Sequence, residues 1–261
     1  MIKTGLVSIT FRKLSVDEII RLVSEAGLDS IEWGGDVHVP HGNISAARNA
    51  KRLCDSSGLE VASYGSYYKA GSGPKQELSF SSILDTALEL DAGTIRVWAG
   101  EKNREDADPE YQSMVIDDLL RIADLAKESG PSISIEFHGG TLTNTNDSAI
   151  QLIKELSHPN IRLYWQPPVG RDEKYCMDGL ERISDSVSNL HVFHWDVLDG
   201  RIQRLPLADG EISWLKYLSI FKRTEKTRHA LIEFVKDDAP ENLISDASAL
   251  KSWVQKINQP H

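Results

Sequence analysis

The chain has few cysteines, and this limits the chemistry that thiols can contribute. Cys54 and Cys176 are the two cysteines in 261 residues, and neither lies in a CxxC motif or at a Cys/His spacing typical of zinc sites. A disulfide framework is therefore excluded as the basis of the fold. We expect two buried thiols within helices of a protein in a reducing cytosol, in preference to redox or metal-binding cysteines.

Long apolar stretches are also absent from the sequence. No segment approaches the ~20 apolar residues of a membrane-spanning helix. The first residues, MIKTGLVSITFRKL, resemble a strand followed by a turn and lack the apolar core and cleavage site of a signal peptide. We therefore expect a cytoplasmic protein that does not bind a membrane.

Basic patches and common nucleotide motifs are missing. Acidic residues number 39 against 29 basic ones, which gives a formal net charge of −10, and no run of lysine or arginine offsets it. Such a surface repels phosphate backbones, so nucleic acid is not an expected partner. The sequence contains no GxSxG, HExxH, Walker or GxGxxG motif, which argues against the common hydrolase, zincin and nucleotide-binding classes.

The sequence does contain a regular alternation of short β-rich runs with helical segments. The eight runs are GLVSITF, SIEWGG, EVASYGSY, TIRVWAG, SISIEF, IRLYWQ, LHVFHW and HALIEF. Strands separated by helices pair in parallel, so eight such units predict a single α/β domain, a (β/α)₈ TIM barrel over residues 1–261. An open doubly wound sheet is the alternative. It usually has a glycine-rich loop after its first strand, where this chain reads TFRKLS.

The first helical segment has clear boundary signals. Ile19, Ile20, Val23 and Ala26 share one face. Ser15 and Glu18 form a capping-box pattern ahead of them, and Gly27 marks the expected end.

Four of the apolar runs in the second half end in residues that can bind a cation, namely Glu136, Gln166, His194 and Glu233. Their separations of 30, 28 and 39 residues match successive strand–helix units, so one barrel can direct all four at one centre. Carboxylate, amide and imidazole ligands suit a divalent ion, with Mn²⁺ expected and Mg²⁺, Co²⁺ or Zn²⁺ as alternatives. A single glutamate could instead pair with an arginine, and His194 alone could be structural. Gln166 could equally bind a substrate hydroxyl or cap its strand.

Six further residues follow strands one, two, four, five and six, on the side where barrel active sites form. They are the candidate substrate-binding residues Arg12, Glu32, His41, Trp98, His138 and Arg171. Aromatic faces suit the C–H faces of sugars, and arginines bind hydroxyl, carbonyl or phosphate groups. The alternatives are ordinary packing for the tryptophan and solvated side chains for the histidines and arginines.

The segments SITFR, SIEWGG, IEFHGGTLTNT, HVFHWD and the last IEF resemble the xylose isomerase-like TIM-barrel superfamily, the sugar phosphate isomerase/epimerase group. The resemblance covers essentially the whole chain. It implies a metal held by Glu136, Gln166, His194 and Glu233, with Gln166 where the family usually has aspartate. It also implies a small carbohydrate substrate and, with the two glutamates as catalytic acid and base, proton transfer through an enediolate.

The same resemblance leaves other functions open. The SITFR and EFHGGTLTNT segments are also similar to 3-dehydroshikimate dehydratases, so a metal-dependent lyase acting on a keto sugar or cyclic keto acid is the main alternative. A non-catalytic sugar-binding barrel is a third possibility, and an endonuclease is the least expected because of the charge. A homo-oligomer is compatible with the sequence.

Overall fold

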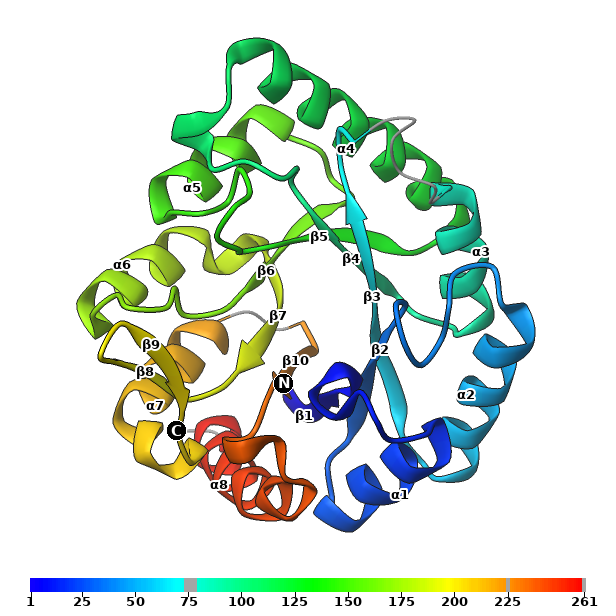
Figure 1. The fold of residues 1–261 in the computed structure, drawn as a ribbon, viewed down its shortest axis with the longest axis vertical. Coiled ribbons are helices and arrows are strands. Elements are labelled where there is room, and N and C mark those ends of the chain that lie inside the picture. Colours follow the sequence, from blue (N-terminus) through cyan, green and yellow to red (C-terminus); the bar gives the residue numbers. More distant parts are fainter. Residues whose placement is uncertain (73–78, 224–225, 260–261) are drawn as a thin grey trace.

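A computed structural model describes residues 1–72, 79–223 and 226–259 of the chain. Within these residues, eight parallel strands close into a barrel and helices surround it (Figure 1). The barrel strands are β1 (Ile2–Val7), β2 (Ser30–Gly34), β3 (Glu60–Lys69), β4 (Thr94–Trp98), β5 (Ser132–Glu136), β6 (Ile161–Trp165), β7 (Val187–Val192) and β10 (Arg228–Ile232). The helices between and after them are α1 (Val16–Ala26), α2 (Ile44–Ser56), α3 (Phe80–Glu89), α4 (Pro109–Ser129), α5 (Asn146–Leu156), α6 (Glu173–Ile183), α7 (Glu211–Phe221) and α8 (Pro240–Asn258).

The first and last barrel strands pair directly. The register of β1 against β10 runs from Ile2↔Arg228 to Leu6↔Ile232. This pairing leaves the barrel without an open edge, so the predicted TIM barrel is confirmed and the doubly wound sheet is excluded.

Helix α1 begins and ends where the sequence indicated. The Ser15 side chain accepts the Glu18 backbone N–H, and the Glu18 carboxylate accepts the Ser15 N–H in return. At the other end Gly27 adopts a left-handed conformation with φ 64°, which costs little only for a residue without a Cβ.

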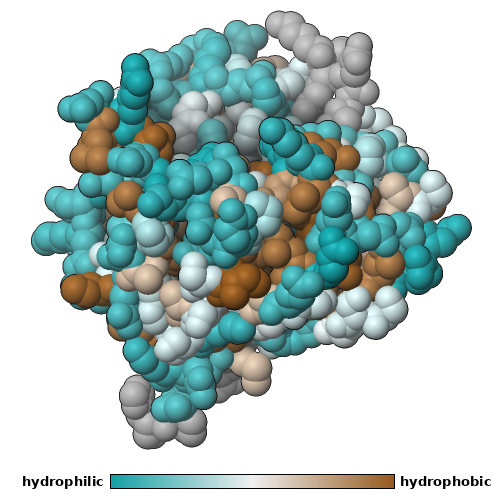
Figure 2. All heavy atoms as spheres, turned by 60° about the horizontal axis from the view of Figure 1, so that its bottom comes forward, coloured by the Kyte–Doolittle hydropathy of each residue, from teal (hydrophilic) through white to brown (hydrophobic). Residues whose placement is uncertain are grey.

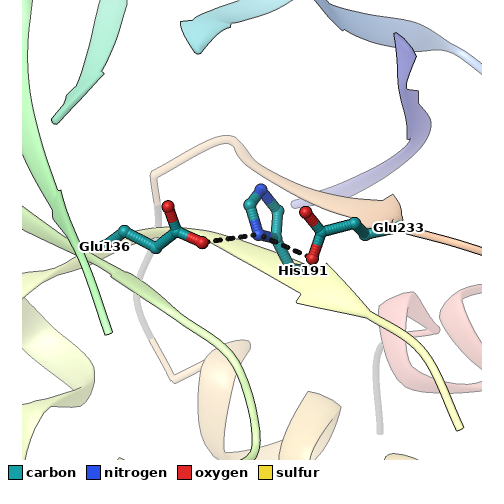
Figure 3. Close-up of side chains that lie close together, drawn as sticks. All are labelled: Glu136, His191 and Glu233. Atoms are coloured by element: carbon teal, nitrogen blue, oxygen red, sulfur yellow. Dashed lines mark ion pairs between the residues drawn. The ribbon is translucent and has the colours of Figure 1, made fainter. Parts of the chain in front are cut away.

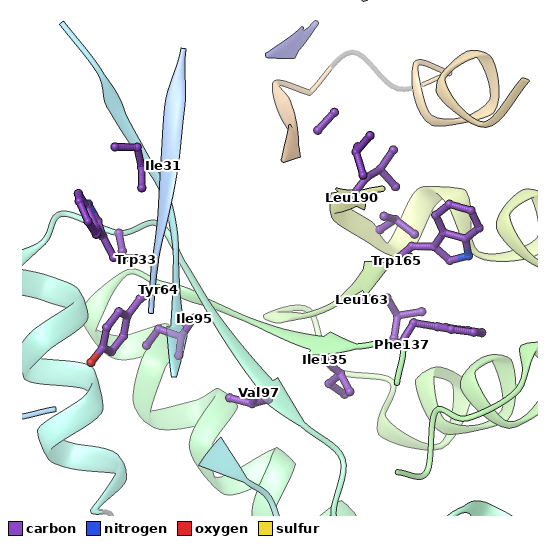
Figure 4. Close-up of a cluster of buried hydrophobic side chains, with 14 of the residues drawn as sticks. Ile31, Trp33, Tyr64, Ile95, Val97, Ile135, Phe137, Leu163, Trp165 and Leu190 are labelled. Atoms are coloured by element: carbon purple, nitrogen blue, oxygen red, sulfur yellow. The ribbon is translucent and has the colours of Figure 1, made fainter. Parts of the chain in front are cut away.

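The hydrophobic core lies between the strands and the surrounding helices. Alternate residues of the barrel strands point outward into it, among them Ile31, Trp33, Ile95, Ile135 and Leu163, all fully buried (Figure 4). Each such side chain contributes about 1.5–3 kcal/mol of transfer free energy. The outer shell is therefore the main source of stability for the barrel.

The interior of the barrel is polar. A small apolar cluster of Val7, Ile9, Ala62, Tyr164 and Leu231 lies inside. The other inward residues at the same level include buried glutamate, arginine and histidine side chains, described below. Many TIM barrels fill this space with layers of aliphatic side chains. Here, charged groups occupy it and must be paired.

A two-stranded hairpin interrupts the alternation after β7. Strands β8 (Trp195–Leu198) and β9 (Arg201–Arg204) pair antiparallel, joined by Asp199 and Gly200, both with positive φ. The run LHVFHW predicts a seventh strand that continues through Trp195, but the strand ends at Val192. The Asp-Gly dipeptide between apolar residues is a hairpin signal, and the correct boundary depends on it.

The surface and the cysteines agree with the sequence-based expectations. On the face shown in Figure 2, hydrophilic side chains predominate and hydrophobic ones form small separate groups. Cys54 in α2 and Cys176 in α6 are buried free thiols, and burial raises the pKa of Cys54 to about 11. In the described parts of the chain, none of the helices combines the length and apolar character that crossing a membrane requires.

Candidate metal and substrate site

Three strands bring Glu136, His191 and Glu233 together at the carboxyl end of the barrel (Figure 3). Glu136 is the last residue of β5, His191 lies near the end of β7, and Glu233 follows β10. Nδ1 of His191 lies 3.3 Å from a Glu233 carboxylate oxygen and 3.7 Å from a Glu136 carboxylate oxygen. All three side chains are buried, and one ligand atom from each lies within 4.8 Å of the others.

Gln166 contributes a fourth polar group from the end of β6. Its Nε2 donates to the Phe137 carbonyl oxygen at 2.9 Å, which fixes the orientation of the amide. Its Oε1 then lies 3.3 Å from Nδ1 of His191. Three of the four residues that the sequence suggested as ligands, Glu136, Gln166 and Glu233, therefore surround one imidazole nitrogen.

The histidine of this group is His191, three residues before the predicted His194. Strand β7 ends at Val192, and its side chains alternate between the two faces of the sheet. His191 therefore points into the barrel, while Leu190 and Val192 face the helices. His194 lies beyond the strand, and its ring packs near Gly210 at the start of α7. The structure does not place His194 at the site. The alternation of polar and apolar residues in NLHV was the signal for His191.

Arg96 connects two buried carboxylates inside the barrel. Its Nε donates to Glu32 at 2.8 Å, and its Nη1 donates to Oε2 of Glu136. The indole N–H of Trp98 donates to the same Glu136 oxygen. Oε1 of Glu136 consequently remains on the side of His191. Arg96 was not among the predicted site residues, although a charged residue in the middle of an apolar strand such as TIRVW is itself a signal.

Glu32 lies deeper than predicted. We had expected it to bind substrate, but its side chain is fully buried and contacts Arg96, the Ser63 hydroxyl and, at 3.5 Å, Nε2 of His191. A carboxylate behind a ligating histidine commonly orients the ring. Glu32 is thus placed to orient His191, and it does not line the cavity described below; its contact with substrate stays a prediction.

Opposing effects set the pKa values of these groups. Burial alone would raise the pKa of Glu136, but Arg96 and then His191 outweigh it and hold that pKa below the usual range. Arg96 likewise keeps the pKa of Glu32 low against its burial. For His191, burial lowers the pKa, whereas the charges of Glu233 and Glu32 raise it to about 10.

The charges and distances fit a divalent cation. The cluster contains three carboxylates, those of Glu32, Glu136 and Glu233, and one guanidinium, that of Arg96. When His191 is neutral, as it is when it binds a metal, the cluster has a net charge of −2. Ligand atoms around an ion with bonds of about 2.1 Å lie roughly 3.0–3.4 Å apart, close to the separations observed around His191. The donor set can therefore accommodate a hard or borderline divalent ion.

A cavity of about 500 Å³ opens above this group. Arg12, Trp98, His138 and Arg171 line it, as do Glu136, Gln166 and Glu233. Tyr67, Phe193, Trp195 and Phe234 add aromatic walls. The His138 ring stacks on Trp98, with ring centres 4.9 Å apart. Four of the six predicted substrate-binding residues thus lie on one cavity wall or rim, within reach of a ligand.

His41, like Glu32, was predicted to contact the substrate but does not line this cavity. It follows β2, and its Nδ1 lies 2.7 Å from the Tyr64 hydroxyl, outside the residues that line the cavity. Burial lowers its pKa. A structural role for His41 is consistent with these contacts.

A profile of the xylose isomerase-like TIM barrel family matches residues 20–253, which is most of the chain. The chain belongs to this family. Membership agrees with the observed barrel and with polar groups at the carboxyl ends of β5, β6, β7 and β10.

Family relatives include two enzyme classes. The chain is 23% identical to a 3-dehydroshikimate dehydratase of Bacillus anthracis, over 95% of this chain and 96% of the relative. It is 24% identical to a probable L-ribulose-5-phosphate 3-epimerase of Mycoplasma pneumoniae, over 97% of this chain and 81% of the relative. A xylose isomerase-like TIM barrel protein of Mycobacterium smegmatis, solved in complex with magnesium, superimposes with a TM-score of 0.75 at 16% identity, covering 98% of this chain and 97% of that one.

Proposed function

We propose that the protein is a divalent-metal-dependent isomerase or epimerase acting on a sugar or sugar phosphate. The observation that carries this proposal is the convergence of Glu136, Gln166 and Glu233 on the buried His191. The three residues other than His191 also line a cavity with aromatic and basic walls. The epimerase and dehydratase relatives and the magnesium-containing neighbour support it. Mn²⁺ or Mg²⁺ is the expected ion, since the donors are mainly oxygen atoms.

The four converging residues would hold the ion through Oε1 of Glu136, Oε1 of Gln166, Nδ1 of His191 and the Glu233 carboxylate. When bound, a divalent ion supplies a Lewis acid that stabilises negative charge on the oxygens of a hydroxy-carbonyl substrate. Glu233 has a carboxylate that lines the cavity, so it can remove the proton from the carbon next to the carbonyl group. In an epimerisation Glu136, on another strand, would have to be protonated before it could return a proton to the carbon from its own side.

The cavity walls would orient the substrate. Trp98 and the His138 ring stacked on it offer an apolar face for the C–H side of a sugar. Arg171 and Arg12 at the rim can donate to hydroxyl or phosphate oxygens.

A lyase is the second candidate, and the contacts of Glu136 favour it. Arg96 and Trp98 both donate to Oε2 of Glu136, and the guanidinium disfavours the protonated form that must return a proton. Elimination requires one base and an acid that protonates the departing hydroxyl group. Glu233 and His138 line the same cavity and can fill those two roles.

Solvent exchange distinguishes the two reactions. The metal-loaded protein would be incubated in D₂O with ketohexoses, pentulose phosphates and 3-dehydroshikimate. Deuterium incorporation without a new ultraviolet-absorbing product supports isomerisation or epimerisation. Formation of a new unsaturated product, such as the aromatic dihydroxybenzoate that 3-dehydroshikimate gives on loss of water, supports elimination. Glu233→Gln should abolish exchange in either case. Silence of the wild type across this panel, with full metal occupancy, would contradict an enolising enzyme and favour a sugar-binding barrel.

Metal binding can be tested separately with matched histidine variants. His191→Ala should lose Mn²⁺, measured by metal analysis after loading and desalting, while His194→Ala should retain it. Less than about 0.1 equivalent in the wild type, or equal loss in both variants, would count against the proposed ligand set.

A further inference from the structure

A second polar cavity, of about 260 Å³, lies at the end of the barrel opposite Glu136. It is lined by the first residues of β4 and β5, Thr94 and Ser132, and by Arg162, the second residue of β6. The amino-terminal ends of parallel strands meet there. This end of a TIM barrel normally contributes stability, and the active site lies at the other end.

The lining of this cavity is basic although the chain as a whole is acidic. Arg162, Lys226 and Arg228 line it together with a single carboxylate, that of Asp185, among the residues described. None of these three cations forms an ion pair within the described structure. The local charge is thus opposite to the net charge of −10 on the whole chain.

Arg162 faces the inside of the barrel. It lies two residues before Tyr164, which belongs to the apolar cluster of the barrel interior, and alternation places both side chains on one face. Among the described residues its polar contact is a long one, with Nη1 lying 3.5 Å from the carbonyl oxygen of the neighbouring Ile161. Most of its five N–H donors are therefore available.

Arg228 is a buried cation that forms no ion pair with the residues the structure describes. Its exposed fraction is 4%, and Nη1 donates to the Phe221 carbonyl oxygen at 3.1 Å while the guanidinium lies over the Phe221 ring. A buried charge usually has an ionic partner, because removing it from water is otherwise unfavourable. Asp185 influences Arg228 from beyond ion-pair distance.

We propose that this cavity binds a small oxyanion, such as inorganic phosphate, held by Arg162 and balanced by the charge of Arg228. Guanidinium groups match the oxygen geometry of phosphate. The hydroxyl groups of Thr94 and Ser132, which hydrogen-bond to each other and, from Ser132, to the Gly93 carbonyl oxygen, add polar lining to the same cavity. The volume is below the ~300–1,000 Å³ typical of metabolite pockets, which favours the free anion over a phosphorylated metabolite. The bound anion stabilises the barrel and takes no part in catalysis.

The test compares the thermal unfolding of the full chain with and without inorganic phosphate at matched ionic strength. A phosphate concentration ten times Kd should raise the Tm of the wild type by about 3–6 °C. Arg162→Gln should remove this shift. Arg171→Gln, which alters the opposite cavity, and Arg21→Gln, which removes an exposed charge on α1, should retain it. Calorimetric titration should show at least tenfold weaker binding of phosphate to Arg162→Gln.

Three outcomes would overturn the proposal. They are no phosphate-dependent shift in the wild type, an undiminished shift in Arg162→Gln, and loss of the shift in Arg171→Gln instead. Binding of glycerol 3-phosphate as tight as that of inorganic phosphate would refute the assignment to a free anion. These results do not depend on the metal or on turnover, so the proposal fails or stands independently of the proposed function.

Discussion

Arg96 offers the most direct test of how the barrel accommodates charge in its interior. Its side chain is 2% exposed and contacts the carboxylates of Glu32 and Glu136, which are as deeply buried. Arg96→Met keeps much of the apolar volume but leaves both carboxylates without their cation. Breaking a buried pair in this way costs about 3–5 kcal/mol. For a domain of this size the expected decrease in Tm is about 6–20 °C.

The pH dependence of the loss identifies its cause. In the wild type Arg96 lowers the pKa values of Glu32 and Glu136, so this stabilisation is present above their unfolded pKa of about 4.3 and is lost as the pH falls below it. The gap between wild type and Arg96→Met should therefore stay wide from pH 7 down to about pH 4.3 and shrink as the pH falls further. Urea unfolding at several pH values measures it, and Arg21→Met should change stability by less than about 0.5 kcal/mol. A loss below about 1 kcal/mol, or a loss independent of pH, would refute the reasoning.

Three further predictions concern the same interior and one helix contact. The pKa of His191 is raised to about 10, so its contribution to the stability of the metal-free protein should be complete below pH 6.5 and lost as the pH rises from 6.5 to 10. Urea unfolding of His191→Gln should show a flatter decline of stability over this range. An unchanged pH profile would contradict the prediction. Trp98→Phe keeps an aromatic wall but removes the donor to Glu136, so kcat/KM should fall about 10- to 100-fold, whereas an unchanged value would show that this bond is dispensable. A Cβ on Gly179 would lie 2.1 Å from Oδ1 of Asn146, so Gly179→Ala should destabilise the fold by about 1–3 kcal/mol, measured by thermal unfolding. The control Gly93→Ala should have a smaller effect, because a Cβ there meets nothing within 4 Å.

The architecture was predictable because each unit repeats the same signals. Eight β-rich runs alternate with helical segments, and boundary residues such as Ser15 and Gly27 act locally, within one turn of helix. Closure of the barrel follows from the number of units and the parallel pairing they impose. The convergence of Glu136 and Glu233 was predictable because charged groups at the ends of buried strands need a partner.

The histidine and the interior network were less accessible from the sequence. Choosing His191 over His194 depends on where β7 ends, and a shift of the strand end changes which histidine faces inward. That boundary lies just before the hairpin β8–β9, which the alternation of strands and helices does not predict. Glu32 was placed too near the surface because its partner, Arg96, lies in a different strand, 64 residues away. Such pairings are properties of the closed barrel and are not visible in local sequence patterns.

The distribution of tryptophans gives the protein a built-in optical probe. Trp33, Trp165, Trp214 and Trp253 are at most 2% exposed, whereas Trp98 and Trp195 line the cavity above Glu136. Fluorescence from the four buried indoles should be blue-shifted and poorly accessible to acrylamide. Light emitted from the cavity pair should be red-shifted and quenched readily. A ligand that fills the cavity should therefore shield two indoles and reduce the quenching of their fluorescence. Binding of candidate compounds can be screened in this way without a label and without an activity assay.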